Sequence, residues 1–224
     1  MATVAFKSLR LLQSRANLHL GCGISVRQLS FSFLGPKKLE DVLKKELVEG
    51  KSATEVADLW YTYHEGKEDV VGLVLNGADG KSVLSRATKC PFFIQPIFRD
   101  DGFFNLVSQF QSPCHFLLAY LEDYKMDPHS ASPLMTFSVF DDYADSKDVT
   151  LVRCDIFNKS IQIEEGRKVV QSLLDNYRKS EEFTSIKVFN ERPAAFDVDD
   201  HISRMNKTWV DYSSANLTSI PKSP

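Results

Sequence analysis

The sequence predicts an α+β fold in a single domain, with a mainly antiparallel sheet flanked by helices. The expected strands come in pairs joined by short polar turns, and strands joined by so few residues run antiparallel. The expected helices lie before, between and after these pairs and do not alternate with single strands, as they do in doubly wound parallel sheets. About 188 residues remain after an N-terminal leader, which suits one domain with a sizeable core.

Two helices are expected in an N-terminal arm over residues 37–66. The first ends at Gly50, and its helically spaced apolar residues are Leu39, Val42, Leu43 and Leu47. Ser52 and Glu55 form a capping box that begins the second helix. The apolar stripe of this second helix consists of Val56, Leu59, Trp60 and Tyr63.

The core of the domain is expected over residues 67–205. It begins with a strand at Val70–Leu75, because valine favours extended structure. Residues 76–80 have the sequence NGADG, which predicts a turn into a short helix. The apolar residues of that helix are Val83, Leu84 and Ala87.

A phenylalanine-rich hairpin is the most distinctive feature of this core. Two strands are expected at Phe92–Phe98 and Phe103–Phe110, joined by a tight turn at Arg99–Gly102. In the first strand, one face carries Phe92, Ile94, Pro96 and Phe98, and the other carries Phe93, Gln95, Ile97 and Arg99. Both faces are largely apolar, so one can enter the core while the other must be covered by the domain's own helices or by another protein.

An uncovered remainder of the hairpin would be a partner-binding site, because Phe and Arg are enriched at protein interfaces. The candidate partner-binding residues are Phe92, Phe93, Phe98, Arg99, Phe103, Phe104 and Gln109.

The remaining elements complete the α+β pattern. Apolar residues at helical spacing over residues 116–124 predict a helix that is closed by Asp127 and Pro128. Strands are expected at Leu134–Phe140 and Val149–Ile156, joined by a polar turn at residues 144–147. Two further helices are indicated by apolar stripes. The first stripe consists of Val169, Val170, Leu173, Leu174 and Tyr177, and the second of Phe183, Ile186 and Phe189. Residues 206–224 are expected to form a flexible tail.

The N-terminal stretch has the composition of a targeting segment. The first 39 residues contain no Asp or Glu, and their basic residues are Lys7, Arg10, Arg15, Arg27, Lys37 and Lys38. Arginines mixed with serines and leucines are typical of an organelle transit peptide and favour the mitochondrial matrix over plastids. We expect a transit peptide over residues 1–36, cut after Leu29 or near Pro36; a basic arm that binds nucleic acid is the alternative.

Charge and cysteine spacing exclude several function classes. Without residues 1–36 the net charge changes from −3 to −7, with 23 basic against 30 acidic residues, so nucleic acid is not an expected partner. No run approaches the roughly 20 apolar residues that span a bilayer, so no stable membrane association is expected. Neither the cysteines nor the histidines show metal-ligand spacing.

Three short motifs resemble chemical sites, and each has a structural interpretation that we favour. Gly77–Ser82 resembles a phosphate loop, but its glycines lie two residues too close together to cradle phosphates around Lys81. Cys114 beside His115 could form an activated thiol, but neighbouring residues often point apart, and we interpret Cys114 as a core residue. Asp197–His201 lacks the glycine and the final glutamate of a calcium loop. No catalytic, cofactor-binding or metal-binding residue is predicted.

The hairpin resembles a segment of the mitochondrial assembly factors of the ATP synthase F1 complex that chaperone the beta subunit. The matching segments are Cys90–Pro96, Arg99–Phe104, Gln109–Gln111 and His115–Phe116, followed in order by Lys147, Leu151–Arg153, Phe189–Asn190, Pro193 and Phe196. Earlier in the chain, Glu55, Trp60, Tyr63 and His64 are similar to the family's first helix. The resemblance covers about residues 38–204. One departure is Asp148, where the family pattern leads us to expect a glycine.

The resemblance implies a non-enzymatic chaperone without a cofactor. Its implied partner is the newly imported beta subunit, which it would hold until the alpha subunit arrives, without hydrolysing ATP. An unassembled subunit exposes an interface that aggregates unless it is covered. The alternatives are a small matrix enzyme that uses Cys114 or a nucleotide at Lys81, and a structural subunit of an organelle complex.

Overall fold

The structure is a computed structural model that describes residues 37–215, with side chains through Tyr212. The expected transit peptide over residues 1–36 and residues 216–224 of the expected tail lie outside the described residues.

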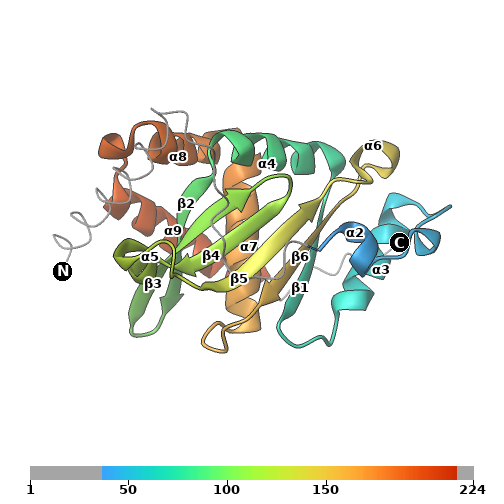
Figure 1. The fold of residues 1–224 in the computed structure, drawn as a ribbon, viewed down its shortest axis with the longest axis horizontal. Helices are drawn as coiled ribbons and strands as arrows, with labels where there is room; N and C mark the ends of the chain where they lie inside the picture. Colours follow the sequence, from blue (N-terminus) through green and yellow to red (C-terminus); the bar gives the residue numbers. More distant parts are fainter. Residues whose placement is uncertain (1–36, 216–224) are drawn as a thin grey trace.

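The described chain forms one six-stranded antiparallel sheet, as the sequence predicts (Figure 1). The strands are β1 (Val70–Leu75), β2 (Phe92–Arg99), β3 (Gly102–Gln111), β4 (His115–Tyr120), β5 (Pro133–Phe140) and β6 (Thr150–Ile156). Their order in the sheet is β1-β6-β5-β4-β3-β2. Strands β2 to β6 therefore follow one another in space as in sequence, and β1 closes the far side next to β6.

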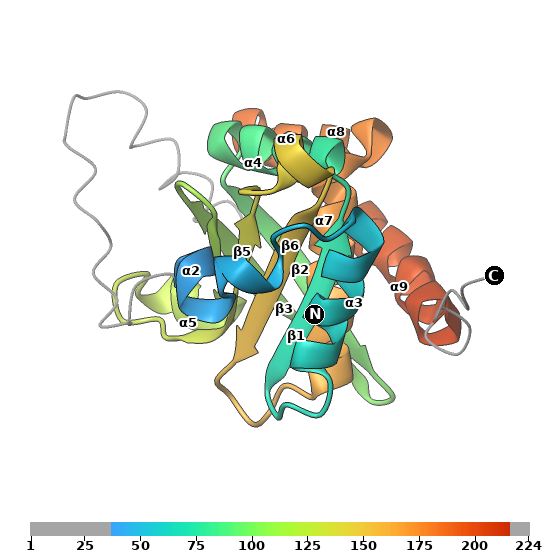
Figure 2. The same cartoon turned by 90° about the vertical axis from the view of Figure 1, so that its right-hand side faces the viewer.

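Helices cover both faces of the sheet. Figure 2 shows α7 (Ile163–Arg178) and α9 (Val198–Ala215) on one side, and α2 (Leu39–Val42) and α5 (Leu121–Met126) on the other. The remaining helical elements are η1 (Lys45–Leu47), α3 (Ala53–His64), α4 (Gly77–Lys89), α6 (Ala144–Lys147), α8 (Ser180–Glu191) and η2 (Pro193–Ala195). The α+β class and the antiparallel sheet are thereby confirmed.

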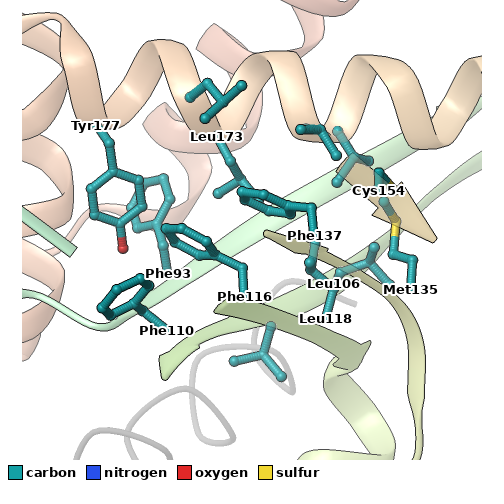
Figure 3. Close-up of a cluster of buried hydrophobic side chains, with 14 of the residues drawn as sticks. Phe93, Leu106, Phe110, Phe116, Leu118, Met135, Phe137, Cys154, Leu173 and Tyr177 are labelled. Carbon is teal, nitrogen blue, oxygen red and sulfur yellow. The ribbon is translucent and has the colours of Figure 1, made fainter. Parts of the chain in front are cut away.

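Alternation along the strands places a dense aromatic core under α7. Figure 3 shows Leu173 and Tyr177 reaching from this helix toward Phe93, Phe116 and Phe137 on the strands. The rings of Phe116 and Phe137 are stacked with their centroids 4.3 Å apart. The hydroxyl of Tyr177 donates a hydrogen bond to the carbonyl of Cys90 at 2.7 Å, so this buried polar group is satisfied.

A smaller core lies at the other end of the sheet and holds the N-terminal arm. Trp60 on α3 is fully buried against Phe140 and donates its indole N–H to the carbonyl of Val152 at 3.1 Å. The predicted capping box is confirmed, since the amide of Ser52 donates to the carboxylate of Glu55 and the amide of Glu55 donates back to the Ser52 hydroxyl. The arm is therefore packed on the domain.

Side chains close the outer edge of β2. The amide of Asn190 on α8 donates to the carbonyl of Phe92 at 2.7 Å and accepts from its N–H at 3.1 Å. The next outward carbonyl, that of Ile94, accepts from Nε2 of His201 on α9 at 3.2 Å. Pro96 has no N–H to offer. This edge strand thus presents few backbone groups for pairing with another strand.

The predicted helix over residues 116–124 is wrong for most of its length. Residues 115–120 form the central strand β4, and only Leu121–Met126 is helical. Phe116 and Leu118 point into one face of the sheet while Leu117 and Ala119 point into the other, and all four are buried. A strand that is buried on both faces has no polar alternation, so its periodicity resembles that of a buried helix.

Four further elements differ from the predictions. The first expected helix is interrupted at Leu43, which adopts an extended conformation with φ −133° and ψ 120°. Leu43 and Val48 lie about 140° apart around an unbroken helix, and the interruption lets both enter the smaller core. A turn is expected at residues 76–80, but these residues begin helix α4. A turn is also expected at residues 144–147, but these residues form the short helix α6. Helix α9 continues to Ala215, through the first part of the expected tail.

The glycine at position 80 is required by close packing of α4 on β6. A Cβ atom at Gly80 would lie 2.0 Å from Oγ1 and 2.5 Å from Cβ of Thr150. We expect Gly80→Ala to lower the free energy of unfolding by about 1–3 kcal/mol in urea titrations, although alanine is the better helix former. Ser85→Ala on the exposed face of the same helix is the control and should not destabilise. Stabilisation by Gly80→Ala would contradict this packing.

Three buried histidines are held in the neutral form. Burial lowers the pKa of His64, His115 and His201 from 6.5 to about 4 in each case. Nδ1 of His64 donates to the carbonyl of Trp60 at 2.7 Å, so its Nε2 accepts from the guanidinium of Arg153 at 3.4 Å. Nδ1 of His201 is buried without a hydrogen-bond partner in the described chain. A proton would be unfavourable at each site.

The protein should therefore lose stability in mild acid. The unfolded state binds protons below about pH 6.5 and the folded state only below about pH 4, so stability falls as the pH falls through this window. Between pH 7 and pH 5 we expect a loss of about 2 kcal/mol for each histidine in urea titrations. His115→Asn should flatten the pH dependence by about a third. Equal stability at pH 7 and pH 5 would refute the assignment.

Candidate functional site

The tip of the phenylalanine hairpin extends beyond the rest of the sheet. Strands β2 and β3 pair along their whole length, from Phe92 opposite Gln109 to Arg99 opposite Gly102. The next strand, β4, pairs with β3 only from Leu106 onward. Residues 102–105 are therefore held by β2 alone, and the end of the hairpin is a two-stranded ribbon, seen below α5 in Figure 1.

The two faces of this ribbon carry different contacts, as the predicted alternation requires. On one face, Phe98 and Phe103 are cross-strand partners with ring centroids 5.7 Å apart. On the other face, the guanidinium of Arg99 lies 5.0 Å from the ring centroid of Phe104, whose ring packs 5.8 Å from that of Tyr120. Phe103 is 51% exposed and Phe98 is half-buried. The exposed aromatic surface lies on the first face.

An ion pair joins the ribbon to α7. Nε and Nη2 of Arg99 donate to the two carboxylate oxygens of Glu165 at 2.7 and 2.9 Å, and Nη2 also donates to the carbonyl of Ser160 at 2.6 Å. The hydrogen bond to Glu165 raises the pKa of Arg99. Burial acts to raise the pKa of Glu165, but the hydrogen bonds from Arg99 and the amide of Gln162 outweigh it and lower that pKa. Arg99 positions the ribbon and does not present an unpaired charge.

The structure separates the candidate partner-binding residues. Phe93 is fully buried, with its ring packed edge-on against Phe189 and Phe196, so the prediction that it contacts a partner is wrong in this fold. Phe92 and Gln109 are half-buried and lie opposite each other at the base of the hairpin, far along the strands from the tip. Phe98, Arg99, Phe103 and Phe104 come together at the tip.

Helix α9 adds a residue to this site that the sequence reasoning missed. The indole of Trp209 packs against Phe98 with ring centroids 6.0 Å apart, and Nζ of Lys168 lies 5.0 Å from the centroid of the indole. Trp209 fell in the expected flexible tail, although its spacing from His201 and Met205 indicates one helical face. We define the tip surface as Phe98, Asp100, Asp101, Phe103 and Trp209.

The motif that resembles a phosphate loop is already occupied by the protein's own groups. Asn76 caps α4 by accepting from the amide of Asp79 at 2.7 Å, and the amide of Gly77 donates to the carboxylate of Asp148 at 2.9 Å. Lys81 forms an ion pair with Asp145. Because these groups take the helix N-terminus and the lysine, the geometry favours packing over phosphate binding.

The departure at Asp148 has a backbone reason. This residue adopts a left-handed conformation with φ 54° and ψ 38°, which explains why glycine is expected here. Aspartate is among the residues that tolerate this region, and its carboxylate also caps α4.

The thiol and acidic motifs also have structural roles. Cys114 is half-buried, and burial raises its pKa, which disfavours the reactive thiolate. The neighbouring His115 hydrogen-bonds through Nδ1 to the hydroxyl of Ser138 at 2.8 Å. In the acidic motif, Asp197 accepts from the amide of Asp200 at the start of α9. Within residues 37–215, no group of three or more His, Cys, Asp or Glu side chains could hold a metal ion.

Comparison with known families resolves the resemblance. The family model described as "ATP11 protein" matches residues 25–202, which is more than half of the chain. The chain belongs to the ATP11 protein family. The family match includes the whole hairpin and ends inside α9, before Trp209.

Two of the three relatives described here for this ATP11 family member carry the name of an assembly factor. The chain is 23% identical over 166 residues to "ATP synthase mitochondrial F1 complex assembly factor 1" of Danio rerio, covering 73% of this chain and 54% of that protein. The protein of the same name from Mus musculus is 24% identical over 170 residues, covering 75% and 52%. "Protein atp11, mitochondrial" of Schizosaccharomyces pombe is 27% identical over 131 residues, covering 56% and 46%. The chain spans about half the length of these curated relatives.

A search for membrane spans adds one finding. Of the helices between residues 37 and 215, none combines the length and the apolar character needed to cross a bilayer.

Phe93 is the most buried phenylalanine of the hairpin and Phe103 the most exposed, so their substitution should change the free energy of unfolding by very different amounts. Phe93→Ala leaves a cavity in the aromatic core and should lower the free energy of unfolding by about 3–5 kcal/mol. Phe103→Ser removes a side chain that is 51% exposed and packs on Phe98, and it should lower the free energy of unfolding by only about 0.5–1.5 kcal/mol. Urea titration followed by circular dichroism measures both. A comparable loss from Phe103→Ser would place Phe103 in the core and remove it from the candidate site.

Proposed function

We propose that this protein is a non-enzymatic chaperone of the mitochondrial matrix that binds the unassembled beta subunit of ATP synthase and promotes its assembly with the alpha subunit. The observation that carries the proposal is the aromatic tip surface, placed on a projecting ribbon in a chain that belongs to the ATP11 protein family. The names of its relatives, which are F1 complex assembly factors, support the same role.

The physical task explains why a projecting surface is suitable. A free subunit exposes the apolar interface that its neighbour will later cover, and such a surface aggregates at cellular concentrations. A chaperone must cover part of that interface and still yield to the alpha subunit. A small contact with a few aromatic anchors binds with limited area and can be displaced by a larger interface.

The way in which the candidate motifs are used supports a chaperone that acts without a catalytic step. Asp148 and Asn76 satisfy the N-terminus of α4 from within, and Lys81 pairs with Asp145. Burial raises the pKa of Cys114, and His115 is engaged with Ser138. In the proposed function, binding and release depend on competition between subunits and not on ATP hydrolysis.

Matrix location fits the acid-free leader. The first 39 residues carry six basic residues and no Asp or Glu, which supports import into mitochondria.

A pull-down with separated subunits tests the function. The mature protein, processed in mitochondria and purified through a C-terminal tag, is offered isolated beta subunit, isolated alpha subunit and the assembled hexamer. We expect retention of the beta subunit alone, less light scattering from beta subunit kept at 37 °C, and no ATP turnover. Equal retention of all three, or of none, would refute the proposal.

A further inference from the structure

We propose that the tip surface recognises an apolar pocket with a basic rim on its client, with Phe103 entering the pocket and Asp100 and Asp101 facing the rim. This inference rests on the proposed chaperone function and specifies the chemistry of the surface that the chaperone covers.

Phe103 has the properties of an anchor for such a pocket. Its ring is 51% exposed at the end of the ribbon, where the residue is paired only with Phe98 of the neighbouring strand. The exposed half of this large aromatic side chain forgoes the free energy that its burial would contribute, so the fold alone does not favour the exposure. Burial in a partner would recover this free energy.

The anchor is supported from behind. The Phe103 ring contacts that of Phe98 at 5.7 Å between centroids, and Phe98 in turn contacts Trp209 at 6.0 Å. Trp209 is only 7% exposed and is held on α9, which is tied to α7 by a hydrogen bond of 2.7 Å from the Tyr212 hydroxyl to Asp175. A pre-positioned aromatic side chain loses little conformational entropy on binding, which favours its use as an anchor.

The charge beside the anchor is negative. Asp100 and Asp101 are exposed in the turn of the hairpin, directly before Gly102 and Phe103. The cation next to them, Arg99, forms its direct ion pair with Glu165 and acts on Asp101 only at longer range. Lys168 lies over Trp209, one turn of α7 from Glu165. The hairpin end of the tip surface therefore carries two exposed carboxylates beside a guanidinium that is already paired with Glu165.

This arrangement specifies the complementary partner. An apolar side chain flanked by two carboxylates fits a pocket whose rim carries Lys or Arg, because like charges at an interface cost free energy and opposite charges accelerate association. The net charge of −7 predicted for the chain without residues 1–36 adds to this preference for a basic surface.

Binding measurements with paired variants test the inference. The dissociation constant of purified beta subunit and the mature protein is measured by calorimetry at low and at physiological salt. Phe103→Ser should weaken binding about 30-fold, as expected for loss of an aromatic hot spot. The double variant Asp100→Asn, Asp101→Asn should weaken it about 5-fold at low salt and reduce its dependence on salt.

The chain offers a matched control for each change. Leu47 is 49% exposed and lies in η1 on the N-terminal arm, so Leu47→Ser removes a similarly exposed apolar group elsewhere. Asp141 and Asp142 are an exposed acidic pair before α6, so Asp141→Asn with Asp142→Asn removes the same charge elsewhere. Both controls should bind within about 2-fold of the unaltered protein. Thermal unfolding of every variant confirms that the fold is intact.

The outcomes separate this inference from the proposed function. Normal binding by both tip variants would overturn the inference and leave the chaperone function standing. Failure of the unaltered protein to bind beta subunit would overturn the function itself. If Phe103→Ser weakened binding but the double variant Asp100→Asn, Asp101→Asn had no effect, the proposed basic rim would be overturned. A dimer in light scattering that Phe103→Ser converts to a monomer would show that the tip binds a second copy and would overturn the inference.

Discussion

The packing of α7 across the sheet is the constraint on which the other elements depend. A Cβ atom at Gly166 would lie 2.5 Å from Cδ1 of Ile156, so the helix rests almost directly on the strands. Its buried positions then serve as attachment points: Arg86 of α4 donates to the carbonyl of Tyr177, and Ser172 donates to the side chain of Gln95 on β2. Displacement of this one helix would loosen its contacts with α4, with β2 and with β6.

The hairpin tip illustrates how a rigid body supports an exposed surface. The ribbon lacks a third strand beyond Leu106, and a two-stranded ribbon is only marginally stable by itself. Arg99 compensates by joining the ribbon to Glu165 on α7, while Trp209 of α9 buttresses it from the edge. Where the ribbon has no third strand beside it, the geometry of the tip surface depends on helices that come much later in the chain.

The sequence predicted correctly the features that depend on residues close together in the chain. The Ser52 capping box, the β2–β3 hairpin and the alternation of its faces all follow from neighbouring residues, and the structure confirms them. Strand β4 was missed because burial on both faces removes the alternation that identifies a strand. Trp209 was missed for a different reason: its spacing from His201 and Met205 indicates a helix, but its contact with Phe98 joins residues more than a hundred positions apart. The core position of Phe93 likewise depends on helices distant in sequence.

The Asn190 clamp on β2 has a consequence for specificity. An open strand edge can form backbone hydrogen bonds with any extended polypeptide, whatever the side chains of that polypeptide are. In this protein few backbone groups on the outer edge of β2 are available for such bonds. Asn190 takes both groups of Phe92, His201 takes the carbonyl of Ile94, and Pro96 has no N–H. Recognition at this edge must then come from side-chain shape and charge, which discriminate between partners. In the proposed function, this edge would not serve as a template for the growth of aggregating client chains.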